Sequence, residues 1–262
     1  MKQALLRAVG SDHIPIEHLA ALLESFTLKH AAKQLVKLLD TAESQELSLR
    51  QFLLEMLETE VKGRNERRRK RNTAAAHFPP HLKALEEFDP LELDSGITEG
   101  QLRHLRELSW LDNCSNIVFA GPPGLGKTMI AVGLGMVAIQ NGYTVCFERM
   151  VNLIKLLDNA ENERTAGFRL KNLKKAQLII IDEIGYTPIT RNQANKFFTL
   201  ISDTYETSSI IFTTNKEITD WAEMMGDPVL TTALLDRILH RAKCFSLKGQ
   251  SYRLKHPDTF IE

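Results

Sequence analysis

The glycine-rich segment GPPGLGKT, residues 121–128, has the residue types and the spacing that bind a chain of phosphates. It matches the pattern G-x-x-x-x-G-K-[ST], in which glycines let backbone N–H groups turn inward around phosphate oxygens. In such a loop Lys127 reaches the β- and γ-phosphates and Thr128 binds Mg²⁺. We therefore expect a site for ATP and Mg²⁺ that includes Gly121, Pro122, Pro123, Gly124, Leu125, Gly126, Lys127, Thr128 and Met129.

Two adjacent carboxylates, Asp182 and Glu183, follow four large apolar residues in the segment LIIIDEIG, residues 178–185. Neighbouring negative charges are unfavourable unless a cation or a proton transfer uses them. Downstream of a phosphate loop, Asp182 is predicted to hold Mg²⁺, directly or through water, and Glu183 to orient and deprotonate the attacking water. Standing alone, the same string would be an ordinary strand that ends in a solvated acidic turn.

Three more residues are candidates for the same chemistry. Asn215 ends the segment TTN, and its amide can hydrogen-bond the γ-phosphate or the attacking water. Arg237 and Arg241 lie four residues apart, on one face of an expected helix. One of them is a candidate arginine finger, which stabilises charge on ATP held by a neighbouring subunit. The alternative is that both are solvated or pair with Asp236.

The helices and strands that hold these residues are predicted from the hydrophobic pattern. The uninterrupted apolar run before Asp182 is typical of a strand covered on both faces, as in a parallel sheet. Expected strands alternate with expected helices, the strands at 116–120, 144–147, 178–182 and 209–213 and the helices at 127–141, 151–158 and 192–206. This alternation predicts an α/β fold, a parallel sheet with helices on both faces. Ligands bind at the carboxyl ends of such strands.

Residues 1–72 have a helical pattern and are predicted to form a small all-α domain that precedes the α/β domain. Its third helix is the clearest, because Ser48 and Gln51 form a capping box before a run of apolar residues at helical spacing. Three such helices can cover one another's apolar stripes in a bundle. Residues 73–97, with two prolines and an acidic stretch, are predicted to be a connector. Thr98 and Gln101 then open a helix of the α/β domain, residues 98–262.

A basic run, KGRNERRRKR at residues 62–71, continues the third helix. Lys+Arg and Asp+Glu both total 33 in the whole chain, so any affinity for nucleic acid must come from local clustering. The run predicts contacts with a phosphate backbone, and the alternative is a solvated charged helix. The predicted DNA contacts in it are Arg64, Arg67, Arg68, Arg69, Lys70 and Arg71.

Several other classes of protein are not indicated. The longest apolar run, residues 129–139, is too short to span a bilayer, which needs about 20 residues, and no secretory signal is evident. Cys114, Cys146 and Cys244 lack metal-type spacing and are interpreted as small core residues in a reducing compartment. The histidines form no cluster, so a transition metal is not expected. We therefore expect a cytoplasmic protein without a membrane partner.

Five segments together resemble a known family. They are GPPGLGKT (121–128), LIIIDEIGYTPI (178–189), FTTNKEITDW (212–221), LLDRILHRAKCFSLKGQSYRLK (234–255) and the basic ERRRKRNTAAAHFP (66–79). On these segments the chain resembles the IstB-like AAA+ ATPases, the transposition helper proteins of insertion sequences, which are related to the helicase loader DnaC and more distantly to the initiator DnaA. The likeness covers nearly the whole chain. The segment at residues 234–255 is more specific to this family than the phosphate loop is.

The resemblance implies an ATP-dependent, DNA-binding homo-oligomer that hydrolyses ATP, remodels double-stranded target DNA and assists the transposase of its insertion element. It implies that Arg241 matches the finger position best and Arg237 second. Residues 149–175 would be a helical insertion whose inner face meets DNA, which adds Lys171, Lys174 and Lys175 as contacts. Only nine residues follow Arg253, so a separate helical lid is not expected and the role of Arg253 stays open.

Other functions share parts of this pattern. In the same fold, a DnaC-like helicase loader acting in DNA replication would grip a helicase with its N-terminal helices. A small-molecule kinase would need an acceptor site that the sequence does not show. A scaffold without hydrolysis is disfavoured by the presence of Glu183.

Overall fold

The computed structural model describes residues 14–80, 97–185, 188–249 and 251. The chain divides into two compact units, Met1–Lys70 and Arg71–Glu262. No helix among the described residues is long and apolar enough to cross a membrane.

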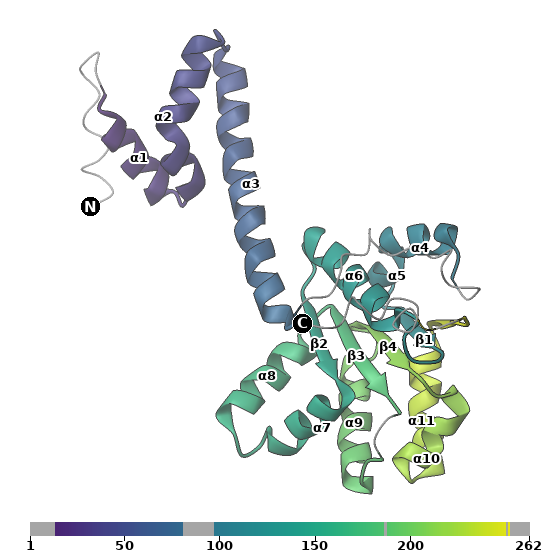
Figure 1. The fold of residues 1–262 in the computed structure, drawn as a ribbon. Coiled ribbons are helices and arrows are strands. Elements are labelled where there is room, and N and C mark those ends of the chain that lie inside the picture. Colours follow the sequence, from purple (N-terminus) through teal and green to yellow (C-terminus); the bar gives the residue numbers. More distant parts are fainter. Residues whose placement is uncertain (1–13, 81–96, 186–187, 250, 252–262) are drawn as a thin grey trace, which may run out of the picture. The chain divides into compact units, whose positions relative to one another are not determined.

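The first unit is helical, as predicted. It contains α1 (Ile16–Ser25), α2 (Lys29–Ser44) and most of α3 (Leu49–Ala76) (Figure 1). The predicted capping box precedes α3, because the Gln51 N–H donates to Ser48 Oγ and the Ser48 N–H donates to Gln51 Oε1. The expectation that the three helices cover one another's apolar stripes is wrong. The buried apolar residues described in this unit lie on α2, whereas α3 exposes half or more of each of Leu49, Leu53, Leu54, Leu57 and Val61.

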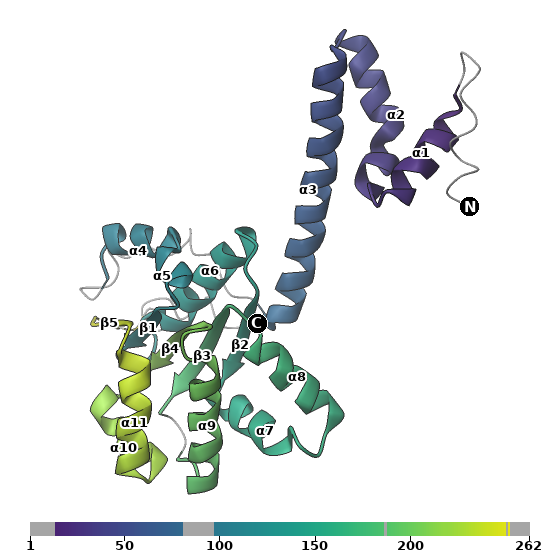
Figure 2. The same ribbon diagram turned by 180° about the vertical axis from the view of Figure 1, so that it is seen from behind.

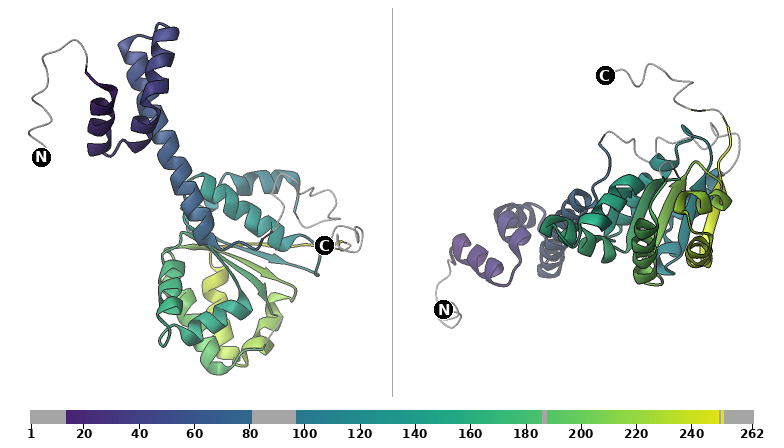
Figure 3. Two further views of the ribbon diagram at one scale, coloured as in Figure 1. Left: turned by 60° about the vertical axis from the view of Figure 1, so that its left-hand side comes forward. Right: turned by 90° about the horizontal axis from the view of Figure 1, so that it is seen from below.

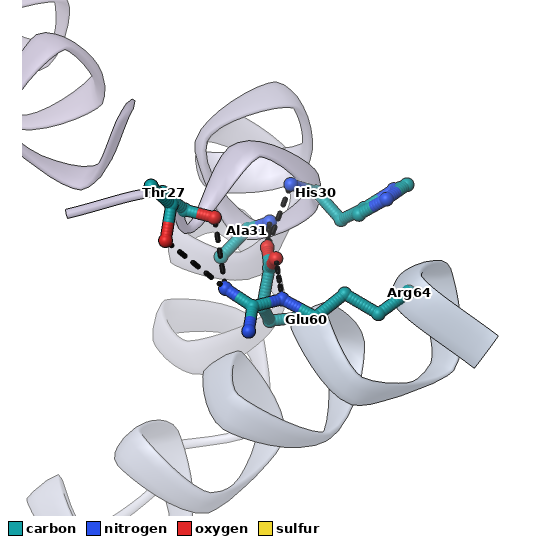
Figure 4. Close-up of polar contacts among 5 residues, drawn as sticks. All are labelled: Thr27, His30, Ala31, Glu60 and Arg64. Carbon is teal, nitrogen blue, oxygen red and sulfur yellow. Dashed lines mark hydrogen bonds and ion pairs between the residues drawn. The ribbon is translucent and has the colours of Figure 1, made fainter. Parts of the chain in front are cut away.

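A buried carboxylate, Glu60, joins α3 to the beginning of α2 (Figure 4). Its Oε2 accepts the N–H groups of His30 and Ala31, which have no partner inside their own helix because they belong to its first turn. Its Oε1 accepts from Arg64 Nε at 2.6 Å, and the same guanidinium donates to Thr27 O at 2.9 Å. Burial by itself raises the pKa of Glu60. The hydrogen bonds and the Arg64 charge together lower it by more, so the pKa lies below its usual value.

The second unit is built on a five-stranded parallel sheet with the strand order β2-β3-β4-β1-β5 (Figures 1 and 2). The strands are β1 (Asn116–Ala120), β2 (Val145–Arg149), β3 (Leu178–Ile184), β4 (Ser209–Thr214) and β5 (Ala242–Ser246). The first four confirm the predicted strands and the parallel sheet. The fifth, β5, was not expected from the sequence.

Helices cover both faces of this sheet (Figure 3). One face carries α4 (Glu99–Arg106), α5 (Ser109–Asp112) and α6 (Lys127–Gln140). The other carries α7 (Met150–Asn159), α8 (Arg164–Lys174), α9 (Arg191–Thr204), α10 (Trp221–Met225) and α11 (Pro228–Leu239), with a short 3₁₀ turn at Ile218–Asp220. The helices enclose a hydrophobic core on each face: the first core lies between the sheet and α4, α5 and α6, and the second between the sheet and α7 to α11. On β3, Ile180 packs in the first core, and Ile179 and Ile181 pack in the second. Burial on both faces explains why this strand lacks polar alternation.

Three further sequence predictions can be compared with the structure: the capping box of α4, the connector, and the burial of the cysteines. The predicted capping box of Thr98 and Gln101 opens α4. Ala76, within the predicted connector, is fully buried in the first core. Cys114 and Cys146 are half-buried, and burial raises the pKa of Cys146 to about 11. Cys244 was expected in the core but is exposed, because it lies on the edge strand β5.

Candidate nucleotide and magnesium site

The phosphate-loop segment leaves the end of β1 and leads into α6. Gly121, Gly124 and Gly126 have φ angles of 144°, 83° and 76°, which side chains rarely adopt. A Cβ at Gly121 would lie 2.3 Å from Leu247 O, and one at Gly124 would lie 2.0 Å from Ser251 Oγ. The chain that follows β5 therefore packs directly against the loop, and glycine is needed both for the turns and for this close approach.

Lys127, the first residue of α6, folds its side chain over this loop. Its Nζ donates to Gly121 O at 2.6 Å and to Pro122 O at 2.7 Å. Neutral carbonyls are weaker partners for an ammonium group than phosphate oxygens are. The N–H groups of the first turn of α6 also face the loop end of the helix, where the helix dipole favours an anion. The segment can therefore bind phosphate through one cation and through backbone donors.

Asp182 is the buried carboxylate of the site, with 1% of its surface exposed. Its Oδ1 accepts two hydroxyl groups, from Thr128 at 2.7 Å and from Thr213 at 2.6 Å. Its Oδ2 is buried and has no hydrogen-bond partner among the described residues. A buried charged oxygen without a partner is costly. The adjacent Thr128 hydroxyl and this oxygen are the hard ligands that Mg²⁺ prefers, so the residues fit the ion.

The described residues hold no cluster of three or more His, Cys, Asp and Glu side chains that could bind a metal ion. This is consistent with Mg²⁺, which usually takes one or two carboxylates and completes its shell with water and substrate phosphates.

Glu183 lies in a β-bulge that the sequence did not predict. Strands β3 and β4 pair Ile181 with Phe212 and Ile184 with Thr214, so Asp182 and Glu183 together oppose the single residue Thr213. Glu183 has φ 62°, a left-handed conformation uncommon outside glycine. Its side chain is exposed, and one of its carboxylate oxygens lies 3.9 Å from Arg149 Nε at the end of β2. The bulge thus separates a buried carboxylate from an exposed one at the carboxyl edge of the sheet.

Asn215 comes directly after β4, on the strand that adjoins the acidic pair. Its Oδ1 is buried and lacks a hydrogen-bond partner in the described structure, like Asp182 Oδ2 on β3. An amide oxygen of this kind accepts a hydrogen bond from water or another donor. The structure therefore brings the loop, the acidic pair and Asn215 to one edge of the sheet.

Arg237 and Arg241 lie at the opposite edge. The Asn116 N–H, at the start of β1, donates to Arg241 O, whereas the phosphate loop follows the last residue of β1. A five-residue strand spans about 16 Å, so neither guanidinium reaches the nucleotide site of its own chain. Arg237 stacks 4.5 Å from the centre of the Phe198 ring. Arg241 is exposed, and its Nη2 lies 3.9 Å from Glu206 Oε1. Of the two arginines, Arg241 is the more accessible to a neighbouring molecule.

The residues predicted to contact DNA differ in their surroundings. Arg64 has its guanidinium bound to Glu60 and Thr27. Lys70 pairs with Glu66, and Lys174 with Asp203. The remaining predicted contacts are exposed and make no ion pair with a described residue: Arg67, Arg68, Arg69 and Arg71 on α3, and Lys171 and Lys175 on or just after α8. Arg253 lies outside the described residues.

The parallel sheet, the loop after β1 and the acidic pair on β3 define a P-loop fold of the AAA+ class, as predicted. A crystal structure of DnaI has the same fold, with a TM-score of 0.55 at 15% identity, covering 66% of this chain and 95% of that one. AMPPCP-bound DnaA from Aquifex aeolicus has a TM-score of 0.52 at 18% identity, covering 68% of this chain and 54% of that one. Likenesses at this level of identity show the fold alone.

The chain belongs to the family of IstB-like ATP binding proteins, which it matches over residues 21–259. A Pseudomonas aeruginosa protein, named as an ATP-binding protein of insertion sequence IS21, is 39% identical over 240 residues, 92% of this chain and 90% of that protein. A Bacillus thuringiensis subsp. berliner protein, named for insertion sequence IS232, is 37% identical over 239 residues, 91% of this chain and 95% of that protein. The family expected from the sequence is confirmed.

Proposed function

We propose that this protein binds ATP with Mg²⁺ at the phosphate loop, hydrolyses it, and uses ATP to assemble on double-stranded DNA in support of a transposase. The main support for this proposal is the hydrogen bonding of Asp182. Asp182 accepts the Thr128 hydroxyl from the loop and keeps a second buried oxygen without a partner among the described residues. Membership of the IstB-like family and relatives named for insertion sequences support the link to transposition.

Each residue of the site has a chemical task in this proposal. Lys127 and the N–H groups at the start of α6 bind phosphate oxygens, and Thr128 and Asp182 hold Mg²⁺. When bound, Mg²⁺ neutralises charge that develops on the β- and γ-phosphates. Glu183, exposed at the carboxyl edge, accepts a proton from the attacking water. Asn215 Oδ1 accepts a further hydrogen bond from that water and orients it.

The position of the arginines supports an oligomer. Because Arg241 is exposed at the edge away from its own phosphate loop, it can complete only a site in another subunit. There it would stabilise charge in the transition state without contributing to nucleotide binding by its own chain. Arg237 is the less suitable candidate, because its guanidinium stacks on Phe198.

Mixing two inactive variants tests the shared site. Lys127→Ala should lose ATP binding, and Arg241→Ala should bind ATP but lose turnover by about 10³-fold or more. Mixtures should regain activity, because some interfaces pair an intact arginine with an intact loop. Arg237→Ala is the matched control and should keep turnover by itself. Mixtures that stay inactive at every ratio would contradict a site shared between subunits.

A helicase loader is the second candidate, because the family that the sequence resembles is related to the helicase loader DnaC. The fold likeness to DnaI does not bear on this choice, since at 15% identity it shows the fold alone. Family membership and the two relatives above favour the insertion-sequence function. A transposase reading frame next to the one for this chain would support the first candidate. Co-purification with a replicative helicase and not with a transposase would support the loader.

A further inference from the structure

Thr213, on β4, is a buried residue that the proposed chemistry leaves without a task. It is 1% exposed and lies opposite the bulge formed by Asp182 and Glu183. Nothing in the sequence pattern distinguishes it from the neighbouring Thr214 in the segment TTN. Its contacts do distinguish it, because the Thr214 hydroxyl turns to the backbone of Lys216 whereas that of Thr213 turns to the acidic pair.

The Thr213 hydroxyl makes two bonds of fixed direction. It donates its single proton to Asp182 Oδ1 at 2.6 Å and accepts the backbone N–H of Glu183 at 3.0 Å. A hydroxyl has one donor and two acceptor lone pairs, so both bonds form at once. One side chain on β4 therefore holds the carboxylate of one acidic residue and the backbone of the next.

The second bond has a clear structural reason. A bulge leaves its extra residue out of the strand-to-strand ladder, so the Glu183 N–H needs another acceptor. The left-handed conformation of Glu183 is also unfavourable for a residue that carries a Cβ. The Thr213 oxygen provides this acceptor and so stabilises the bulge. In a regular strand, without the bulge, the Glu183 side chain would point to the other face of the sheet.

We propose that Thr213 is a positioning residue for ATP hydrolysis, which fixes the direction of Glu183 through its backbone N–H and the orientation of Asp182 through Oδ1. The inference rests on the proposed ATPase function. Thr213 has no role in binding the nucleotide, so its loss acts on the rate of hydrolysis and leaves ATP affinity nearly unchanged.

Three variants and one control test this role. Thr213→Val removes the hydroxyl and keeps a side chain of similar shape, and Thr213→Ala removes it without adding a methyl group. Thr213→Ser keeps the hydroxyl. Thr204→Val is the matched control, because Thr204 is equally buried but its hydroxyl binds carbonyl oxygens within α9, away from the site.

The first readout separates rate from binding. In Thr213→Val and Thr213→Ala, kcat should fall by about 10–100-fold, the usual effect of losing a partner of a metal-binding carboxylate. KM and the Kd of a fluorescent ATP analogue should stay within about threefold of wild type, because the loop is intact. Thr213→Ser should restore most of the rate, and Thr204→Val should match wild type.

The second readout does not depend on activity. Hydrogen exchange should be faster at the Glu183 amide in Thr213→Val and Thr213→Ala than in wild type, Thr213→Ser or Thr204→Val. Wild-type turnover in both hydroxyl-free variants, or unchanged exchange at Glu183, would overturn the inference alone. A folded wild-type protein that binds ATP but never hydrolyses it would overturn the proposed function and this inference with it.

Discussion

At the scale of single residues, the closest constraint on the phosphate loop is its contact with the chain after β5. Gly124 has φ 83°, and a Cβ there would meet Ser251 Oγ at 2.0 Å. Gly226 has a similar φ of 63°, but a Cβ there would meet nothing within 4 Å. The two glycines therefore share one conformational requirement and differ in the space around them.

We predict that Gly124→Ala weakens ATP binding by about tenfold or more, because backbone strain and the displaced Ser251 both distort the loop. Gly226→Ala should lose roughly 1–2 kcal/mol of stability from strain and keep its ATP affinity. Calorimetric titration with ATP and thermal unfolding of both variants would measure this. Equal ATP affinity in the two variants would contradict the role assigned to the contact.

From the sequence we proposed a chemistry for the acidic pair, but its geometry could not be predicted. The order of apolar and acidic residues indicates a strand end beside a phosphate loop, and that was enough to propose roles for Asp182 and Glu183. The bulge depends on how β3 pairs with β4, since Thr213 is 30 residues away from Glu183 in the chain. No local pattern carries that information.

At the scale of elements, most helices and strands followed from periodicity, and the exceptions have physical reasons. The edge strand β5 (AKCFS) buries only Phe245 of its five residues, so it shows no buried run. The helix α8 buries two side chains and lacks an apolar stripe. Conversely, α3 shows a clear leucine stripe that remains exposed, because periodicity predicts which face is apolar and not whether another element covers it.

The contact between α2 and α3 predicts a pH dependence. In the folded state the pKa of Glu60 is below its usual value of 4.5. The ionised Glu60 carboxylate therefore stabilises the fold above pH 4.5, and this stabilisation is lost as the pH falls through the lower, folded-state pKa. Glu60→Gln should destabilise the first unit by about 1–3 kcal/mol at neutral pH, because an amide cannot replace all the acceptors.

The wild-type and Glu60→Gln proteins can be compared by urea unfolding, followed by circular dichroism from neutral pH to about pH 3. The difference between them should shrink toward acid, where Glu60 becomes protonated in both states. A difference that stays constant with pH would contradict the assigned ionisation.

At the scale of the whole molecule, the chain has no net charge, so DNA binding must depend on where its cations are exposed. We predict that replacing Arg67, Arg68, Arg69 and Arg71 by alanine weakens duplex binding and flattens its salt dependence by up to about 0.9 log units for each phosphate interaction removed. ATP should strengthen binding of the wild type by assembling several basic clusters along one duplex.

Arg64→Ala is the control for this experiment. Its guanidinium is bound to Glu60 and Thr27, so its loss should lower stability and leave the salt slope nearly unchanged. An unchanged affinity and slope in the four-arginine variant would place the DNA interface elsewhere, with Lys171 and Lys175 on or just after α8 the next residues to replace.

We propose that this chain hydrolyses ATP through Glu183. The most direct measurement compares ATP affinity and ATP turnover in wild type and Glu183→Gln, in the presence of Mg²⁺ and DNA. Because only the group that accepts the proton from water is lost, Glu183→Gln should keep its Kd for ATP within about threefold and lose turnover by about 10²–10⁴-fold. A Glu183→Gln protein that hydrolyses ATP at the wild-type rate would contradict the assignment.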